Sequence, residues 1–221
     1  MAFGKLLVQQ PLMRSVLADL ALESEAATML ALRLARAFDE SGSVLERAYR
    51  RVLTPASKFW VCKRTIEAAA ECMEVWGGNG YIENGPMPRL LREAPVNSIW
   101  EGSGNVMCLD VLRALRREPD LAEALLASLR DDAAGEPLLE RAVDELAGVF
   151  RLEGQELESS ARFVAQQLVL LVQAGLLRRH STTMAADAFV ASRFSGAGGR
   201  VYGVTAGKVA PAAVIQRAWH T

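Results

Sequence analysis

The sequence is poor in the residues that metal centres and disulfide frameworks need. Its 221 residues include two histidines, His180 and His220, and three cysteines, at positions 62, 72 and 108, with no CxxC pair. A structural zinc site needs four such ligands at short spacings, so we expect no metal. An odd number of scattered cysteines is typical of reduced thiols. We therefore expect a cytoplasmic protein whose thiols are buried and structural.

Long apolar runs and nucleotide-binding loops are also missing. The most apolar stretch, residues 168–177, is interrupted by Gln173 and is shorter than the roughly 20 residues of a membrane span. The first residues show neither the basic region nor the apolar region of a signal peptide. No P-loop and no βαβ alternation is present, which argues against a dinucleotide-binding fold of the Rossmann type. We expect no membrane contact.

What the chain does contain favours helix. Ala, Leu, Arg and Glu dominate, and hydrophobic residues make up 51% of the chain against 23% charged. Apolar residues recur at helical spacing over residues 12–40, and a second pattern over 44–76 is interrupted at Thr54-Pro55, where a kink or break is expected. Further helices are predicted at 103–117, 119–131, 137–153, 159–180 and 182–194. The sequence predicts an all-α fold, with an antiparallel helix bundle over residues 1–117 and a helical extension over 118–221.

Two segments depart from the helical pattern. Residues 77–88 hold four glycines and two prolines, so we predict a long loop with one short helical turn at 88–93. Residues 97–105 read Asn-Ser-Ile-Trp-Glu-Gly-Ser-Gly-Asn, and place Glu101 between an aromatic residue and a turn that opens a helix. A carboxylate in such a place suits abstraction of a proton next to a carbonyl.

From these residues alone we expect Glu101 to lie in a pocket, beside a groove lined by Gly77 and Gly78. Glycines let flat groups approach the backbone, and helix N-termini bind phosphate oxygens. The alternatives are plainer. Glu101 is then a surface carboxylate that interacts favourably with a helix N-terminus, and the glycine segment is a turn without a ligand.

Three motifs in register resemble the C-terminal domain of acyl-CoA dehydrogenases over residues 2–117. They are Ala2-Phe3-Gly4-Lys5, Gly77-Gly78-Asn79-Gly80-Tyr81 and the segment 97–105. Trp100 and Ser103 stand where Tyr and Thr are common in the family. Together with the extension after residue 118, they make the chain similar to the alkylation-response (AidB) branch.

The resemblance implies an FAD-dependent oxidoreductase that acts on acyl-CoA and assembles as a homotetramer. Glu101 matches the catalytic base, which removes the α-proton while hydride passes from the β-carbon to the flavin. The implied cofactor contacts are Phe3, Leu7, Gly77 and Gly78, toward the FAD of a neighbouring subunit, and Ser103 and Asn105. Trp100 and Arg113 match the substrate entrance.

Some family features are absent from the sequence. A family glutamine falls on Pro11 and another on Glu74, and the flavin-contacting arginine would precede Met1. The N-terminal helical domain and the β-barrel domain of the family are not found in these residues either. We therefore expect a truncated product or a fragment, and expect the 221 residues alone to be catalytically silent.

An alternative function is nonspecific binding of double-stranded DNA by the extension, with little or no dehydrogenase activity. Residues 159–221 carry a net charge of +6, whereas residues 118–158 carry −9. A basic surface of this kind binds phosphates, and proteins of the AidB branch bind DNA. The candidate contacts are Arg178, Arg179, Arg193, Arg200 and Lys208. The plainer alternative is that these side chains form solvated faces or interact with helix C-termini.

Overall fold

The computed structural model describes residues 4–39, 42–196, 201–204 and 210–219, and every regular element in these ranges is helical. The all-α prediction is therefore confirmed. The elements in chain order are η1 (Leu7–Gln9), α1 (Pro11–Asp39), α2 (Val44–Ala48), the π-helical η2 (Tyr49–Leu53), α3 (Thr54–Val75), α4 (Gly78–Tyr81), α5 (Met87–Asn97), α6 (Gly104–Arg117), α7 (Pro119–Ala133), α8 (Pro137–Val149), α9 (Gly154–Ser159), α10 (Ala161–His180), α11 (Thr183–Phe194) and α12 (Pro211–Ala218).

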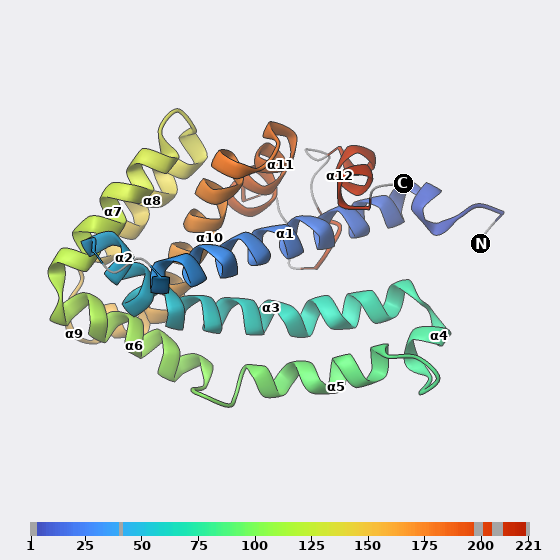
Figure 1. Ribbon diagram of the computed structural model, residues 1–221, viewed down its shortest axis with the longest axis horizontal. Coiled ribbons are helices and arrows are strands. Elements are labelled where there is room, and N and C mark those ends of the chain that lie inside the picture. Colours follow the sequence, from blue (N-terminus) through green and yellow to red (C-terminus); the bar gives the residue numbers. More distant parts are fainter. Residues whose placement is uncertain (1–3, 40–41, 197–200, 205–209, 220–221) are drawn as a thin grey trace.

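The long helices of the first half form the predicted antiparallel bundle. Helices α1, α3 and α5 lie side by side and alternate in direction (Figure 1), and α3 also packs against α6. Because α3 runs the length of this layer, the residues at its two ends are far apart. Its 22 residues span about 33 Å at the helical rise of 1.5 Å per residue.

The predicted interruption at Thr54-Pro55 is present as a π-helical turn. Helix α2 continues through η2 into α3 without leaving helical backbone, and Pro55 lies at the first turn of α3. A proline at that position has no N–H to contribute to the preceding turn. The wider π turn accommodates the mismatch, and the chain bends there.

The glycine- and proline-rich segment is more helical than predicted. Residues 78–81 form the single turn α4, and the expected short turn at 88–93 is the eleven-residue helix α5. Pro88 lies in the first turn of α5, where proline is favourable. Pro95 lies near its end, where packing along α3 and burial of Ala94 outweigh the lost hydrogen bond. At Gly80 a Cβ atom would lie 2.1 Å from the Met73 carbonyl oxygen, so only glycine fits.

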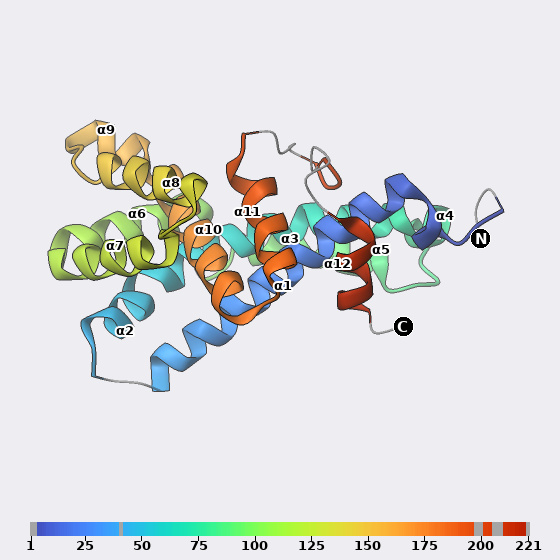
Figure 2. The same cartoon turned by 90° about the horizontal axis from the view of Figure 1, so that it is seen from above.

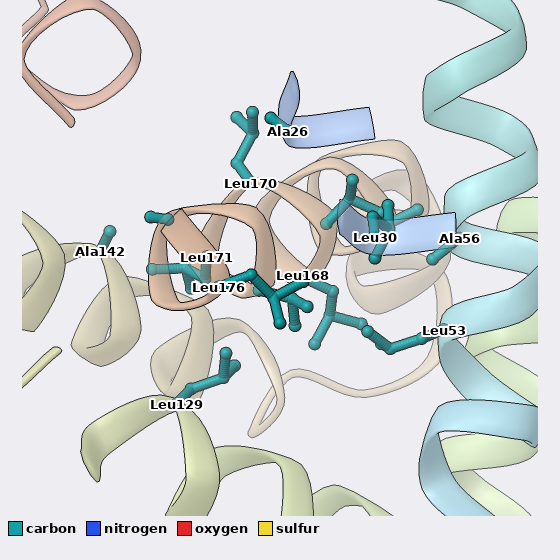
Figure 3. Packing of buried hydrophobic residues seen from close by; sticks show 14 of the residues in the cluster. Ala26, Leu30, Leu53, Ala56, Leu129, Ala142, Leu168, Leu170, Leu171 and Leu176 are labelled. Carbon is teal, nitrogen blue, oxygen red and sulfur yellow. The ribbon is translucent and has the colours of Figure 1, made fainter. Parts of the chain in front are cut away.

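Helix α10 is the centre of the hydrophobic core. Every residue from Leu168 to Leu177 is buried, and the helix packs against α1, α3, α6, α7, α8 and α11. Figure 3 shows Leu168, Leu171 and Leu176 between helices from both halves of the chain. A helix that is apolar on nearly all sides is stable only when it is surrounded, which explains why Gln173 is the one polar side chain in this stretch.

The remaining helices of the extension cover α10 and α1. Helices α7, α8 and α11 pack on α10, and α12 lies across the N-terminal half of α1 (Figure 2). At Gly175 a Cβ atom would lie 2.5 Å from Asp132 Oδ2, so α10 and α7 approach closely there. Buried residues on both sides of residue 117 belong to one cluster. The division into domains 1–117 and 118–221 stays a prediction.

Candidate functional site

The loop between α5 and α6 holds Glu101 in an unusual backbone conformation. Glu101 has φ of 54°, and it is the only non-glycine residue with positive φ in the described part of the chain. Gly102 follows with φ of 112°, and a Cβ atom there would clash with the Met107 side chain. A non-glycine residue in this region costs about 1–3 kcal/mol, and such residues cluster at functional sites.

Lys58 of α3 holds this loop in place through two hydrogen bonds. Its Nζ donates to the Trp100 carbonyl oxygen at 2.8 Å and to the Gly102 carbonyl oxygen, so the two residues flanking Glu101 are bound to one ammonium group. The sequence motif gave no sign of Lys58, because this contact joins residues 42 and 44 positions apart. Lys58 is a site residue that only the tertiary structure reveals.

The prediction that Glu101 lies in a pocket is wrong for this chain. Glu101 is exposed, and Trp100 beside it is 60% exposed, so the expected burial does not occur. The apolar residues Val96, Ile99 and Val106, all within five positions of Glu101 in the sequence, are exposed as well.

The N-terminus of α6 lies directly after this loop. Ser103 is the N-cap residue, but its side chain accepts no capping hydrogen bond, and it is exposed. Asn105, also exposed, accepts a hydrogen bond at 2.8 Å on Oδ1 from Arg162 Nε of α10. Burial raises the pKa of the nearby Cys108 thiol to about 11, while Arg162 and Lys63 act in the opposite direction. The first turn of α6 thus has N–H groups without a side-chain cap, and the two nearby cations are Arg162 and Lys63.

Arg113 lies further along α6 and is also exposed. Nine residues after Gly104, it is about 14 Å along the helix at 1.5 Å per residue. It lines a hollow of about 400 Å³ together with Leu109 and Glu158. The side chain also donates to Asp110 at 3.4 Å, and Asp110 is held by Arg51, which lowers the pKa of the Asp110 carboxyl group. Arg113 stays a predicted entrance residue.

The second set of predicted cofactor contacts gathers at the other end of α3. Gly77 has φ of 59° and ψ of −144°, a combination that is adopted almost only by glycine. A Cβ atom at Gly77 or Gly78 would meet nothing within 4 Å. Leu7 of η1 and Trp76 line an apolar cavity of about 750 Å³, and Trp219 lies on its wall. Phe3 is outside the described residues.

The two sets of predicted contacts do not form one groove. Lys58, which holds the Glu101 loop, is 17 residues before the end of α3 at Val75, or about 25 Å along the helix. Figure 1 shows α4 and the start of α6 at well-separated positions. The expectation that Glu101 lies beside Gly77 and Gly78 is therefore wrong within one chain, because the length of α3 keeps them apart.

The basic side chains predicted to contact DNA are mostly occupied by other protein groups. Arg193 is half-buried and paired with Asp19 at 2.7 Å and Glu23 at 3.0 Å. These two ion pairs occupy its guanidinium group, and DNA contact by Arg193 stays a prediction.

Arg178 and Arg179 bind the end of α7 instead of forming a free basic face. Arg178 donates to the carbonyl oxygens of Asp132 and Ala134, and Arg179 pairs with the Asp132 carboxylate. Arg200 and Lys208 lie outside the described residues. Among the described cations of residues 159–221, Arg193 and Arg217 thus pair with acidic groups of α1, and Arg179 pairs with Asp132 of α7.

None of the helices in the described part of the chain is both long and apolar enough to cross a membrane. The same residues contain no group of three or more His, Cys, Asp or Glu side chains that could hold a metal ion.

Comparison with known proteins gives one family. The model of that family, described as the C-terminal domain of acyl-CoA dehydrogenase, matches residues 1–116. The putative acyl-CoA dehydrogenase AidB of Escherichia coli (strain K12) is 47% identical over 169 residues, which are 76% of this chain and 31% of that protein.

Two solved structures are similar over most of the chain. The apo form of Bd2924 covers 81% of this chain and 35% of its own, with a TM-score of 0.74 and 33% identity. The crystal structure of Caenorhabditis elegans ACDH-11 in complex with C11-CoA covers 99% of this chain and 37% of its own, with a TM-score of 0.75 and 24% identity, which is a likeness of fold alone. The chain spans about a third of the length of these three proteins.

Proposed function

Because the chain belongs to the acyl-CoA dehydrogenase family, we propose that it is the C-terminal part of an FAD-dependent oxidoreductase that oxidises acyl-CoA thioesters. In this proposal Glu101 is the catalytic base. FAD, when bound, supplies the hydride acceptor. The similarity to AidB over residues that include the Glu101 loop supports this assignment.

The backbone of Glu101 is the observation that carries the proposal. A carboxylate residue held with φ of 54° costs free energy that nothing in the local fold requires, since glycine would adopt the same conformation more easily. Lys58 maintains the loop through the two carbonyl groups beside Glu101. This arrangement directs the carboxylate away from the bundle, where its oxygen would accept the α-proton of a thioester that lies against the exposed surface.

The first turn of α6 and the diglycine end of α3 each suit part of a flat, phosphorylated cofactor. The first turn of α6 presents N–H groups that the Ser103 side chain leaves free, and such groups bind oxygens of anionic or carbonyl type. At the other end of α3 the open space over Gly77 and Gly78 permits close approach to the backbone. Glu74, three residues before Gly77, is an exposed acidic residue, which is unfavourable for a phosphate.

A second copy of the chain completes the proposed arrangement. Since the Glu101 loop and the diglycine end are about 25 Å apart along α3, we assign them to two different cofactors. Each cofactor would then contact the Glu101 loop of one copy and Leu7, Gly77 and Gly78 of another. This requires a homo-oligomer, and the resemblance implies a tetramer.

Binding of FAD by the chain tests the proposal, with Gly78→Val as the perturbing variant. The added side chain enters open space, so we expect the fold to persist while FAD quenching of intrinsic fluorescence weakens. Gly42→Val is the matched control, since a Cβ atom there also meets nothing within 4 Å. Saturable FAD binding that Gly78→Val weakens and Gly42→Val does not supports the proposal. Binding that is absent, or equal in all three proteins, contradicts it.

We further propose that the 221 residues alone do not turn over acyl-CoA. Glu101 is exposed to solvent, whereas proton abstraction next to a thioester needs a site that excludes water and orients the substrate. A dye-reduction assay with FAD and isovaleryl-CoA is expected to show no activity above background. Robust turnover that depends on FAD would overturn this part of the proposal.

DNA binding is the weaker candidate function. The three candidate DNA contacts that the structure describes are all paired with acidic or carbonyl groups of the protein; they are Arg178, Arg179 and Arg193. An affinity for duplex DNA that falls steeply with salt would revive it.

A further inference from the structure

Arg162 joins the extension to the first turn of α6. It lies at the start of α10, and its Nε donates to Asn105 Oδ1 at 2.8 Å. The guanidinium carbon also lies 5.8 Å from the centre of the Phe59 ring of α3. Helices α3 and α6 of the bundle therefore fix the position of the Arg162 side chain, which belongs to the extension.

This hydrogen bond sets the orientation of the Asn105 amide. An asparagine side chain has one oxygen acceptor and one NH₂ donor group, and an arginine can only donate. If the amide were reversed, two donors would face each other. With Oδ1 directed toward Arg162, Nδ2 is directed away from it. Asn105 is exposed, so the NH₂ group is available to an acceptor at the surface.

The orientation has a chemical consequence at the α6 N-terminus. The free backbone N–H groups of the first turn and the Asn105 NH₂ group are all donors, and Ser103 adds a hydroxyl group that makes no cap bond. Lys63 adds a second cation, since its side chain would contact a Cβ atom at Gly104. A ligand with several acceptor oxygens or ring carbonyl groups matches this set.

We propose that Arg162 is a positioning residue for the cofactor, which it serves by holding Asn105 with its NH₂ group toward a bound flavin. The inference rests on the proposed function and goes beyond it, because it gives the extension a direct part in the site. Arg162 acts through Asn105 and does not itself touch the cofactor.

FAD titration of the full 221-residue chain tests this, with Arg162→Met, Arg162→Lys and the control Arg130→Met. Arg130 is an exposed cation of α7. It lies near the far end of α10, where Arg178 meets α7, about 24 Å from Arg162 along the helix. We expect Arg162→Met to weaken FAD binding about five- to tenfold, the effect of one hydrogen bond. Arg162→Lys should also weaken it, because the lysine ammonium group lies one bond beyond the position of Nε and lacks the rigid planar geometry of arginine at Asn105 Oδ1. Arg130→Met should not weaken it.

A double-mutant cycle separates positioning from a direct or structural effect. Asn105→Ala should weaken FAD binding, and Arg162→Met should then add nothing, because the residue through which it acts is gone. The urea midpoint of the apo protein should be the same for Arg162→Met and Arg130→Met. Additive losses, or wild-type affinity in Arg162→Lys, would overturn the inference.

The outcomes also distinguish this inference from the proposed function. If the wild-type chain binds FAD and Arg162→Met binds it equally well, only the role of Arg162 is refuted. If the wild-type chain does not bind FAD at any concentration tested, the proposed function and the role of Arg162 both fail.

Discussion

Replacing Glu101 by glycine should stabilise the protein while removing its proposed base. Glu101 has φ of 54°, and its side chain makes no hydrogen bond or ion pair with any residue that the structure describes. The folded state therefore carries the cost of the backbone conformation without a compensating contact. Relief of this cost is expected to appear directly in the free energy of unfolding.

The magnitude follows from two opposing contributions. A non-glycine residue in the left-handed region costs about 1–2 kcal/mol, and glycine returns roughly 0.5–1 kcal/mol of this through its greater freedom in the unfolded chain. We expect Glu101→Gly to be more stable by about 0.5–1 kcal/mol. For a chain of this size the melting temperature should rise by about 1–4 °C.

Glu101→Gln is the matched variant for this experiment, because it removes the charge and keeps the strained backbone. Urea unfolding and thermal melting should give Glu101→Gln the stability of the wild type, with Glu101→Gly above both. The reasoning is refuted if Glu101→Gly is less stable than Glu101→Gln. That result would mean that the loop does not hold residue 101 in the left-handed conformation in solution.

Three further predictions concern the rest of the chain. Arg193→Met should lower the free energy of urea unfolding by about 3 kcal/mol, because the buried carboxylate of Asp19 loses its arginine partner while Glu23 keeps Arg64. The more exposed Arg217→Met should cost less than half of that, and equal losses would contradict this account. Because burial raises the pKa of Cys108 to about 11, its thiol should resist alkylation at pH 8 until the protein unfolds. The stability that the buried neutral thiol contributes is complete below about pH 9 and is lost as the pH rises toward 11. Rapid labelling of Cys108 in the native protein would contradict its burial. The double variant Arg178→Met/Arg179→Met should lower the melting temperature, because both side chains bind the end of α7. In a filter-binding assay it should retain duplex DNA as the wild type does. A large loss of retention would support the DNA-binding alternative.

Much of the fold could be predicted because local patterns and packing agree. The apolar stretch at Leu168–Leu177, interrupted only by Gln173, is typical of a buried helix, and α10 is one. The break at Thr54-Pro55 could be located because proline cannot continue the hydrogen bonding of the preceding turn. Helix α5 was underestimated for the opposite reason, since local rules count Pro88 and Pro95 as breakers and do not see the packing of the helix along α3.

The site was only partly predictable because its geometry depends on distance. The sequence identified the Glu101 motif and the diglycine motif, but it could not show that α3 holds them about 25 Å apart. Nor could it show the partners of the basic residues. Arg193 pairs with Asp19, which is 174 positions away, and Arg162 binds Asn105, 57 positions away. Contacts of this kind leave no trace in a local pattern.

The most direct test of the proposed cofactor site is an FAD titration of the ¹⁵N-labelled chain, followed by its backbone amide resonances. The account predicts two separate groups of shifted resonances, one over residues 100–105 and one over residues 76–78. FAD that shifts neither group, or that shifts only residues near Arg178 and Arg179, would contradict the assignment of Glu101 to a flavin site.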